Sequence, residues 1–196
     1  ITEFRGRGWE IRVHPLSFGE YYETVGGEKA ELLETYYKYG GLPAVVQLQS
    51  QEDKQNYLQE IYKTVYLKDV LERNHLKNPE GMDELVKILA SGIGSSTNVR
   101  RIANTFKSAA NMDIIPATLK KYLECLQDAF FIHEALRFDV KGRKYIGTET
   151  KYYFEDLGIR NAVVDFRQLE PTHAMENMIY NELCRRGFSV DVGLVS

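Results

Sequence analysis

The sequence of 196 residues has only two cysteines, Cys125 and Cys184, and four histidines. Each cysteine lies in a helical pattern among apolar neighbours, and the two form no Cys-x-x-Cys pair. The spacing of the cysteines and histidines does not match a zinc site. We therefore expect two buried, reduced thiols, which are typical of a cytoplasmic protein, and no metal site built from cysteine and histidine.

Several functional motifs are also missing. No apolar run is long enough to cross a membrane and no signal peptide is visible, so no membrane partner is expected. Gly26-Gly27-Glu28-Lys29 has neither the spacing of an ATP-binding phosphate loop nor its magnesium-binding hydroxyl. A Gly-x-Ser-x-Gly elbow, a His-Glu-x-x-His motif and a Rossmann fingerprint are absent. We therefore predict no catalytic residues and no cofactor for this chain.

The net charge of -3 conceals an uneven distribution. Between Thr97 and Lys151 there are 10 Lys and Arg residues against 6 Asp and Glu residues, whereas the remainder has 15 against 22. A locally basic stretch in an acidic chain is typical of a surface that meets a phosphate backbone. A solvated helix face is an equally good interpretation of the pattern alone.

Helix signals occur along most of the chain. Ser17 and Glu20 have the spacing of a capping box, before a short helix that ends at Gly26-Gly27. A helix over Glu28–Tyr39 is expected to end at Gly40-Gly41, and the longest apolar stripe predicts a helix over Gln51–Lys77. Further helices are expected over residues 83–93, 99–107, 116–127, 157–166 and 175–186.

The order of elements from Val99 to Tyr153 decides the fold prediction. A short basic helix is followed by a helix that Pro116 can begin at its first position, and then by strands on either side of Lys141-Gly142. Helix, helix and hairpin come in this order in a winged helix-turn-helix. We predict a mainly α fold with a small antiparallel β-hairpin, in which flanking helices surround a winged helix-turn-helix core.

The predicted winged helix has a basic outer side. The N-terminal half of the second helix of a helix-turn-helix enters the major groove, and the turn of the hairpin would be the wing. The predicted DNA-binding residues are Arg100, Arg101, Thr118, Lys120, Lys121, Lys141, Arg143 and Lys144.

The end of the chain carries one isolated acidic residue and one isolated strand. Glu176, near the start of the last helix, could be one ligand of a metal site, but a carboxylate in that place is also explained by the helix dipole. The strand predicted over Phe188–Val192 has no partner, and one strand cannot form a finished sheet. Because the chain also begins with Ile1 instead of Met, we expect an excised piece of a longer protein.

A series of short motifs resembles one protein family over essentially the whole chain. In chain order the motifs are Gly6-Arg7-Gly8, Pro15–Tyr21, Gly40-Gly41-Leu42-Pro43, Lys68–Arg73, Thr118–Leu123, Lys151–Asn161, Glu176–Leu183 and Arg185-Arg186-Gly187. Their order and spacing resemble the C-terminal domain of unknown function in bacterial and archaeal AAA-type predicted ATPases.

That resemblance implies a division of the chain and a role for two residues. Arg7 would sense nucleotide in the full-length protein, for which ATP and magnesium are the implied cofactors. Glu176 would be the acidic residue of the first endonuclease helix, and would bind a metal only with an acidic strand motif expected soon after Gly193. The implied parts are 1–25, the closing segment of an upstream ATPase module; 26–80, a helical connector; 81–155, a winged-helix domain; and 156–196, the truncated start of a restriction-endonuclease-like α/β domain.

Two functions follow for this chain, and neither is catalytic. The first is non-enzymatic binding of DNA by the winged helix, next to the ATPase module of the full-length protein. The alternative is a protein–protein interaction or oligomerisation module, in which the tyrosine-rich helices over Glu28–Tyr39 and Gln51–Lys77 form the interface of a homo-oligomer.

Overall fold

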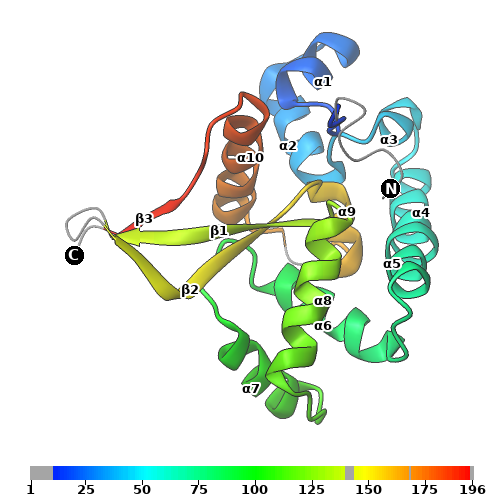
Figure 1. Ribbon diagram of the computed structural model, residues 1–196. Helices are drawn as coiled ribbons and strands as arrows, with labels where there is room; N and C mark the ends of the chain where they lie inside the picture. Colours follow the sequence, from blue (N-terminus) through cyan, green and yellow to red (C-terminus); the bar gives the residue numbers. More distant parts are fainter. Residues whose placement is uncertain (1–10, 140–143, 168, 195–196) are drawn as a thin grey trace.

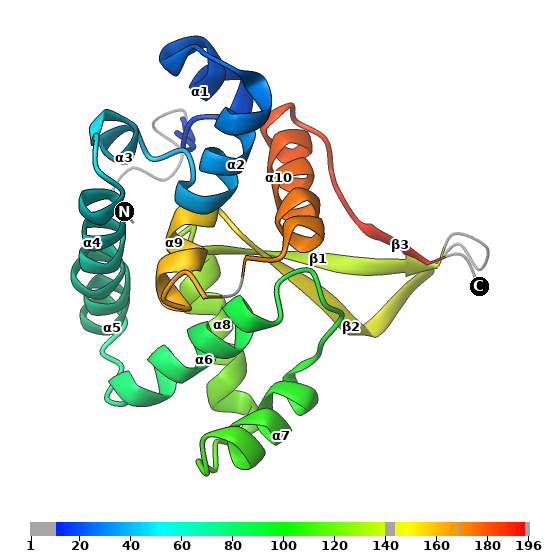
Figure 2. The same ribbon diagram turned by 180° about the vertical axis from the view of Figure 1, so that it is seen from behind.

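The chain is mainly helical with one small sheet, in a computed structural model that describes residues 11–139, 144–167 and 169–194. Side chains are described for these residues except 139, 144–148 and 194. Figures 1 and 2 show a helical body with α1 to α3 at one end, α7 at the other, and the sheet extending to one side. The predicted mainly α fold with a small hairpin is confirmed in this general form.

The first helix, α1 (Phe18–Val25), begins with the predicted capping box. The Ser17 hydroxyl accepts a hydrogen bond from the Glu20 amide (3.2 Å), and the Glu20 carboxylate accepts one from the Ser17 amide (2.7 Å). Two otherwise free N–H groups are satisfied in this way, which fixes where the helix starts.

The next two helices show one confirmed end and one unpredicted start. α2 (Lys29–Tyr39) ends as predicted at Gly40, whose φ of 71° lies in the left-handed region that glycine adopts without strain. Pro43 then begins α3 (Pro43–Gln47), a short helix that was not predicted from the sequence.

The long helix predicted over Gln51–Lys77 is a composite. α4 (Gln51–Ile61) continues into a π-helical segment, η2 (Tyr62–Leu67), and then into α5 (Lys68–Arg73). The helical path is thus continuous to Arg73, but its middle is wound more widely than the 3.6-residue period assumed for the apolar stripe.

The middle of the chain runs helix, bridge, helix, helix, hairpin. After α6 (Pro79–Ser91), Thr97 forms an isolated antiparallel bridge with Thr150, in which each amide donates to the other carbonyl at 2.8 Å. α7 (Val99–Ala109) and α8 (Pro116–Asp128) follow, and proline takes the predicted first position of α8. The predicted order is therefore present, while its assignment as a winged helix stays a prediction.

Among the described residues, the sheet has three strands in the order β2-β1-β3. β1 (Ile132–Asp139) and β2 (Lys144–Phe154) form the predicted antiparallel hairpin. β3 (Val192–Leu194) lies parallel to β1. The strand predicted over Phe188–Val192 therefore starts later than expected, and it does have a partner. β2 and two helices separate β1 from β3 in the chain, so no local pattern reveals the pairing.

The last two helices fasten the hairpin to the body. α9 (Leu157–Val163) contacts α2, α4 and α6, and α10 (Pro171–Arg185) lies against β2, α2 and α9. α10 begins at Pro171 instead of the predicted Met175, because proline suits the first helical position. Within the described ranges, no helix is both long and apolar enough for a membrane crossing. The predicted domain limits stay predictions.

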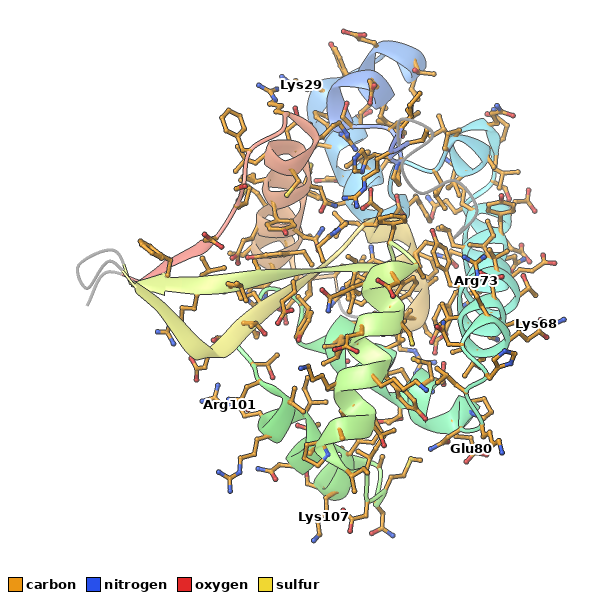
Figure 3. All side chains as sticks on the ribbon, in the orientation of Figure 1. Lys29, Lys68, Arg73, Glu80, Arg101 and Lys107 are labelled. Carbon is orange, nitrogen blue, oxygen red and sulfur yellow. The ribbon has the colours of Figure 1, made fainter. Side chains whose placement is uncertain are left out.

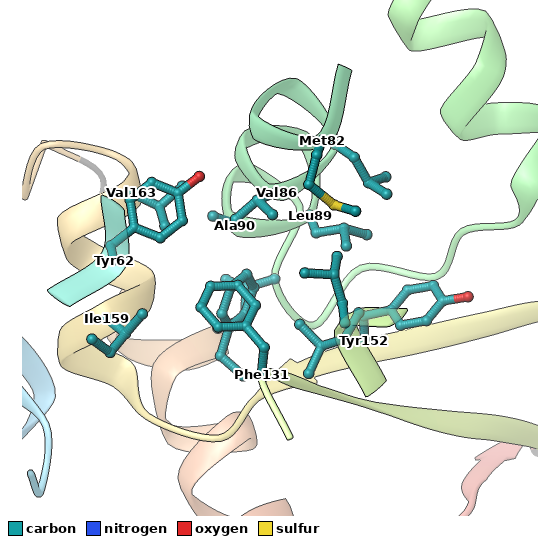
Figure 4. Close-up of a cluster of buried hydrophobic side chains, with 14 of the residues drawn as sticks. Tyr62, Met82, Val86, Leu89, Ala90, Phe131, Tyr152, Ile159 and Val163 are labelled. Carbon is teal, nitrogen blue, oxygen red and sulfur yellow. The ribbon is translucent and has the colours of Figure 1, made fainter. Parts of the chain in front are cut away.

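One hydrophobic core joins these helices to the hairpin. Figure 4 shows Tyr62 from η2, Met82 and Leu89 from α6, Phe131 from the start of the hairpin and Ile159 from α9 converging in it. Burial of one such side chain stabilises the fold by about 1.5–3 kcal/mol. α7 and α8 are attached to this core through one face each, so their opposite faces remain in contact with solvent.

Two buried polar side chains fix α9 and α10. Asp156 caps α9 by accepting the Ile159 amide (3.0 Å), and it also accepts the Gly41 amide (2.8 Å) after α2. Burial raises the pKa of Asp156 to about 6, against the opposing effect of these amides. Asn177 of α10 donates to the Phe154 carbonyl and accepts from the Phe154 amide, both at 2.7 Å. The Asn177 side chain thus takes the place of a neighbouring strand at the end of β2.

Candidate nucleic-acid interface

α7 has one apolar face and one basic face. Its start is fixed by Asn98, whose side chain accepts a hydrogen bond from the Arg101 amide (2.9 Å). Ile102 and Phe106 are buried in the core. The helix contains no acidic residue, and Figure 3 shows Arg101 and Lys107 extending from it at the end of the molecule far from α1. The exposed cations of α7 are Arg100, Arg101 and Lys107.

α8 continues this basic surface with its first turns. Leu119 and Leu123 are buried, whereas Lys120 and Lys121 are exposed and Thr118 is half-buried. No side chain caps the first turn, since the residue before Pro116 is an isoleucine. Of the three predicted contact residues of α8, Lys120 and Lys121 are thus accessible in its N-terminal half and Thr118 is partly covered, while their contact with DNA stays a prediction.

The cations differ in how firmly they are paired. Lys120 lies 4.0 Å from Glu124, with 73% and 59% of the two side chains exposed, so this pair contributes little. Arg101 lies 3.4 Å from Glu149 and donates to the Ser96 carbonyl at 3.2 Å. Arg100, Lys107 and Lys121 form no ion pair within the described ranges.

Glu149 ties the hairpin to the start of α7. Besides Arg101, this β2 carboxylate accepts hydrogen bonds from Arg137 of β1 and from the Ser96 hydroxyl (3.0 Å). Together with the Thr97–Thr150 bridge, these bonds hold the hairpin beside the basic face of α7. Sequence reasoning missed Glu149 and Arg137, because their partners come from another part of the chain.

The predicted wing contacts are only partly placed. Lys141 and Arg143 lie outside the described residues. Lys144 is the first residue of β2, where its backbone pairs with Asp139, but its side chain is not described. Arg7, the predicted nucleotide-sensing residue, also lies outside the described part of the chain.

Glu176 has two direct partners on β2. Its carboxylate accepts hydrogen bonds from the Lys151 ammonium (2.6 Å) and the Tyr153 hydroxyl (2.7 Å). Burial raises the pKa of Glu176, but these bonds outweigh it and hold the pKa below its ordinary value. The helix-dipole interpretation is weakened, because α10 begins at Pro171 and the dipole acts mainly within the first turn. No group of three or more acidic, histidine or cysteine side chains in the described ranges could hold a metal ion.

A carboxylate between two histidines was not predicted. One Glu155 oxygen is 2.6 Å from His14 Nδ1 and the other contacts His133 Nε2; only 11% of the Glu155 side chain is exposed. Burial raises the pKa of Glu155, but the bonds to His133 and His14 outweigh it and lower the pKa. The cluster joins the segment before α1 to β1, so only a long-range contact could have revealed it.

Stability should depend on pH through Glu155. The pKa of Glu155 is lower in the folded state than its ordinary value of 4.5, so the ionised carboxylate stabilises the fold at pH values above 4.5. This contribution is lost as the pH falls through the folded-state pKa. Glu155→Gln should cost about 1–3 kcal/mol near neutral pH, and less below about pH 4.5. Urea unfolding from pH 7 to 3 measures this, with Glu23→Gln on exposed α1 as the control. A penalty that stays constant over the whole range would contradict the expectation.

The similar proteins are twice as long as this chain. An uncharacterized protein of Haemophilus influenzae is 32% identical in an alignment 200 residues long, gaps included, that covers 98% of this chain and 49% of the relative. The uncharacterized protein MJ1544 of Methanocaldococcus jannaschii is 29% identical in an alignment 201 residues long, gaps included, that covers 95% of this chain and 44% of the relative. The chain thus spans about half the length of these relatives.

The family match covers most of the fold described above. A family model for a domain of unknown function, DUF8612, matches residues 30–170, from α2 to α9. This stretch includes the basic faces of α7 and α8 and the whole hairpin. The chain belongs to the DUF8612 family of domains of unknown function.

Proposed function

We propose that α6, α7, α8 and the hairpin form a winged helix that binds duplex DNA without catalysing a reaction on it. The order of these elements supports the proposal. The bridge between Thr97 and Thr150 also supports it, because Thr97 lies between α6 and α7 and extends the hairpin at its β2 edge. In this arrangement the N-terminal half of α8 would approach the major groove, and the hairpin turn would lie beside it.

The observation that carries the proposal is the acid-poor surface of α7 and the first half of α8. From Thr97 to Leu123 the only acidic residue is Asp113, against the five cations Arg100, Arg101, Lys107, Lys120 and Lys121. All five are exposed. Lys and Arg contacts with phosphates supply most of the affinity of such surfaces and make it sensitive to salt.

The DNA-binding module is proposed to belong to a longer AAA-type ATPase. The relatives have as much chain outside the matched half as within it, which leaves room for an ATPase module. ATP and magnesium would bind in that module, since this sequence has no phosphate loop.

The alternative of a tyrosine-rich interface receives less support. Tyr36, Tyr39 and Tyr62 are each at most 8% exposed, so the fold uses them as core residues. These three are therefore unavailable to a partner, and Tyr37, Tyr57 and Tyr66 of the same helices are partly buried against the core. The exposed cations of α7 and α8 favour DNA instead.

Reversing two charges on α8 should abolish most of the DNA affinity. Lys120→Glu/Lys121→Glu should weaken binding of a labelled generic duplex by at least about tenfold at about 50 mM salt, because the variant repels phosphates where the wild type attracts them. Wild-type affinity should itself fall steeply between about 50 and 200 mM salt. Fluorescence anisotropy measures both effects.

A matched control is available on α5. Lys68→Glu/Arg73→Glu makes the same change in charge, and Lys68 resembles Lys120 in that it is 66% exposed and 3.9 Å from an i+4 glutamate. Figure 3 shows Lys68 and Arg73 on a different side of the molecule from Arg101 and Lys107. An equal loss of DNA affinity in both double variants would mean that the affinity depends only on the net charge of the chain, which would contradict a binding surface on α8. Absence of binding at low salt would refute the proposed function.

A further inference from the structure

A groove lies between α1 and α10, at the end of the molecule opposite α7 (Figure 1). Its cavity volume is about 680 Å³, and Phe18, Met178 and Leu183 contribute to its apolar walls. Two large apolar side chains on its lining remain open to solvent, since Ile179 is 50% exposed and Phe188 is 60% exposed. Exposed apolar side chains along a groove are positioned to meet the apolar face of a bound helix.

The α1 side of the groove is acidic. Glu20 and Glu23 line it, and the chain from Ser17 to Glu34 contains five glutamates against the single cation Lys29. On the α10 side, Arg185 and Arg186 both pair with Glu182, at 3.3 and 2.7 Å, which leaves one positive charge there. The negative charge of the groove therefore lies on the α1 side, at Glu20 and Glu23.

One hydrogen-bond acceptor in the groove is unused. The Asn181 side chain donates to the carbonyls of Phe154 and Glu155, at 2.9 and 3.0 Å, which fixes the orientation of its amide. Its buried Oδ1 atom accepts no hydrogen bond from any residue in the described ranges. A buried acceptor of this kind is commonly paired with an ordered water.

We propose that this groove binds a basic amphipathic helix of a partner protein. The apolar face of such a helix would cover Ile179 and Phe188, and its lysine or arginine side chains would lie against Glu20 and Glu23. Binding of an amphipathic helix in an apolar groove is a common mode of peptide recognition. This site does not involve α7 or α8, so it is independent of the DNA-binding proposal.

The test uses two designed helical peptides with the same leucine face. One carries lysines beside the leucines, and the other carries glutamates at the same positions. Fluorescence anisotropy at about 50 mM salt should show binding of the lysine peptide only. Ile179→Asp should weaken this binding by about tenfold and Glu23→Lys severalfold, since both residues are exposed on the groove. Val65→Asp, at a 52% exposed position on η2, should leave it unchanged.

Three results would overturn the proposal. They are no binding of the lysine peptide, equal binding of the glutamate peptide, and binding that neither Ile179→Asp nor Glu23→Lys weakens. Light scattering of the chain alone gives a further decisive readout. A dimer that Ile179→Asp dissociates would mean that a second copy, not a basic helix, occupies the groove. Duplex binding by the same variants should stay at the wild-type value, which separates this test from that of the proposed function.

Discussion

Gly158→Ala is expected to destabilise the fold by about 3 kcal/mol or more, although alanine is the better helix former. Gly158 lies in α9, where it meets the end of α2. A Cβ atom at this position would approach the carbonyl carbon and oxygen of Tyr39 to less than 3.0 Å, a separation that real Cβ atoms essentially never show. Backbone atoms cannot rotate away as a side chain can, so α9 would have to move as a whole.

Such a movement would break the polar contacts that join α9 to α2. Asn161 donates from its amide to the carbonyls of Tyr37 and Lys38, at 2.7 and 2.9 Å. Asp156 accepts the Gly41 amide from the same turn (2.8 Å). Since an unsatisfied buried polar group costs about 1–3 kcal/mol, these losses add to the steric cost.

The control for Gly158→Ala is the same substitution in α1. A Cβ atom at Gly19 would meet nothing closer than the Ser17 hydroxyl at 3.8 Å. Gly19→Ala should therefore leave stability unchanged or raise it by up to about 1 kcal/mol. Urea unfolding of the two variants and the wild type measures the difference. A Gly158→Ala variant as stable as Gly19→Ala would show that α9 and α2 are less closely packed than described.

The sequence predicted those parts of the fold that depend on neighbouring residues. The capping box of Ser17 and Glu20, the end of α2 at Gly40 and the start of α8 at Pro116 all rest on rules that span at most four residues. Each of these predictions is confirmed. The exposure of Lys120 and Lys121 follows from the same short period, because one face of α8 is apolar and the other is not.

The features that were missed depend on residues far apart in the chain. The parallel pairing of β3 with β1, the contact of His14 with Glu155 and the bond of Lys151 to Glu176 all join distant segments. A local pattern gives the type of each element but not which elements meet. The candidate DNA surface shows the same division: Arg101 was identified from its helix, but its partner Glu149 was not.

Asn177→Asp is expected to cost about 3 kcal/mol at neutral pH, and to lower the melting temperature by about 6–12 °C. The substitution replaces an N–H donor by an oxygen that faces the Phe154 carbonyl. Asn177 is fully buried, so water cannot solvate the new carboxylate. Asn104→Asp, at an exposed position on α7, makes the same chemical change where water is available, and it should have little effect.

The same substitution should produce a pH dependence that identifies its cause. The carboxyl group that Asn177→Asp introduces could, when protonated, again donate to the Phe154 carbonyl and accept from the Phe154 amide, as Asn177 does. The folded state would therefore raise the pKa of this carboxyl. Because the pKa is raised, the loss of unfolding free energy is large at high pH, and it becomes smaller as the pH falls towards the pKa of a free carboxyl. The difference in unfolding free energy between variant and wild type should thus shrink from pH 7 to pH 4, because effects common to both proteins cancel. A penalty independent of pH would instead assign the loss to packing around α10, because packing does not change with the protonation of one side chain.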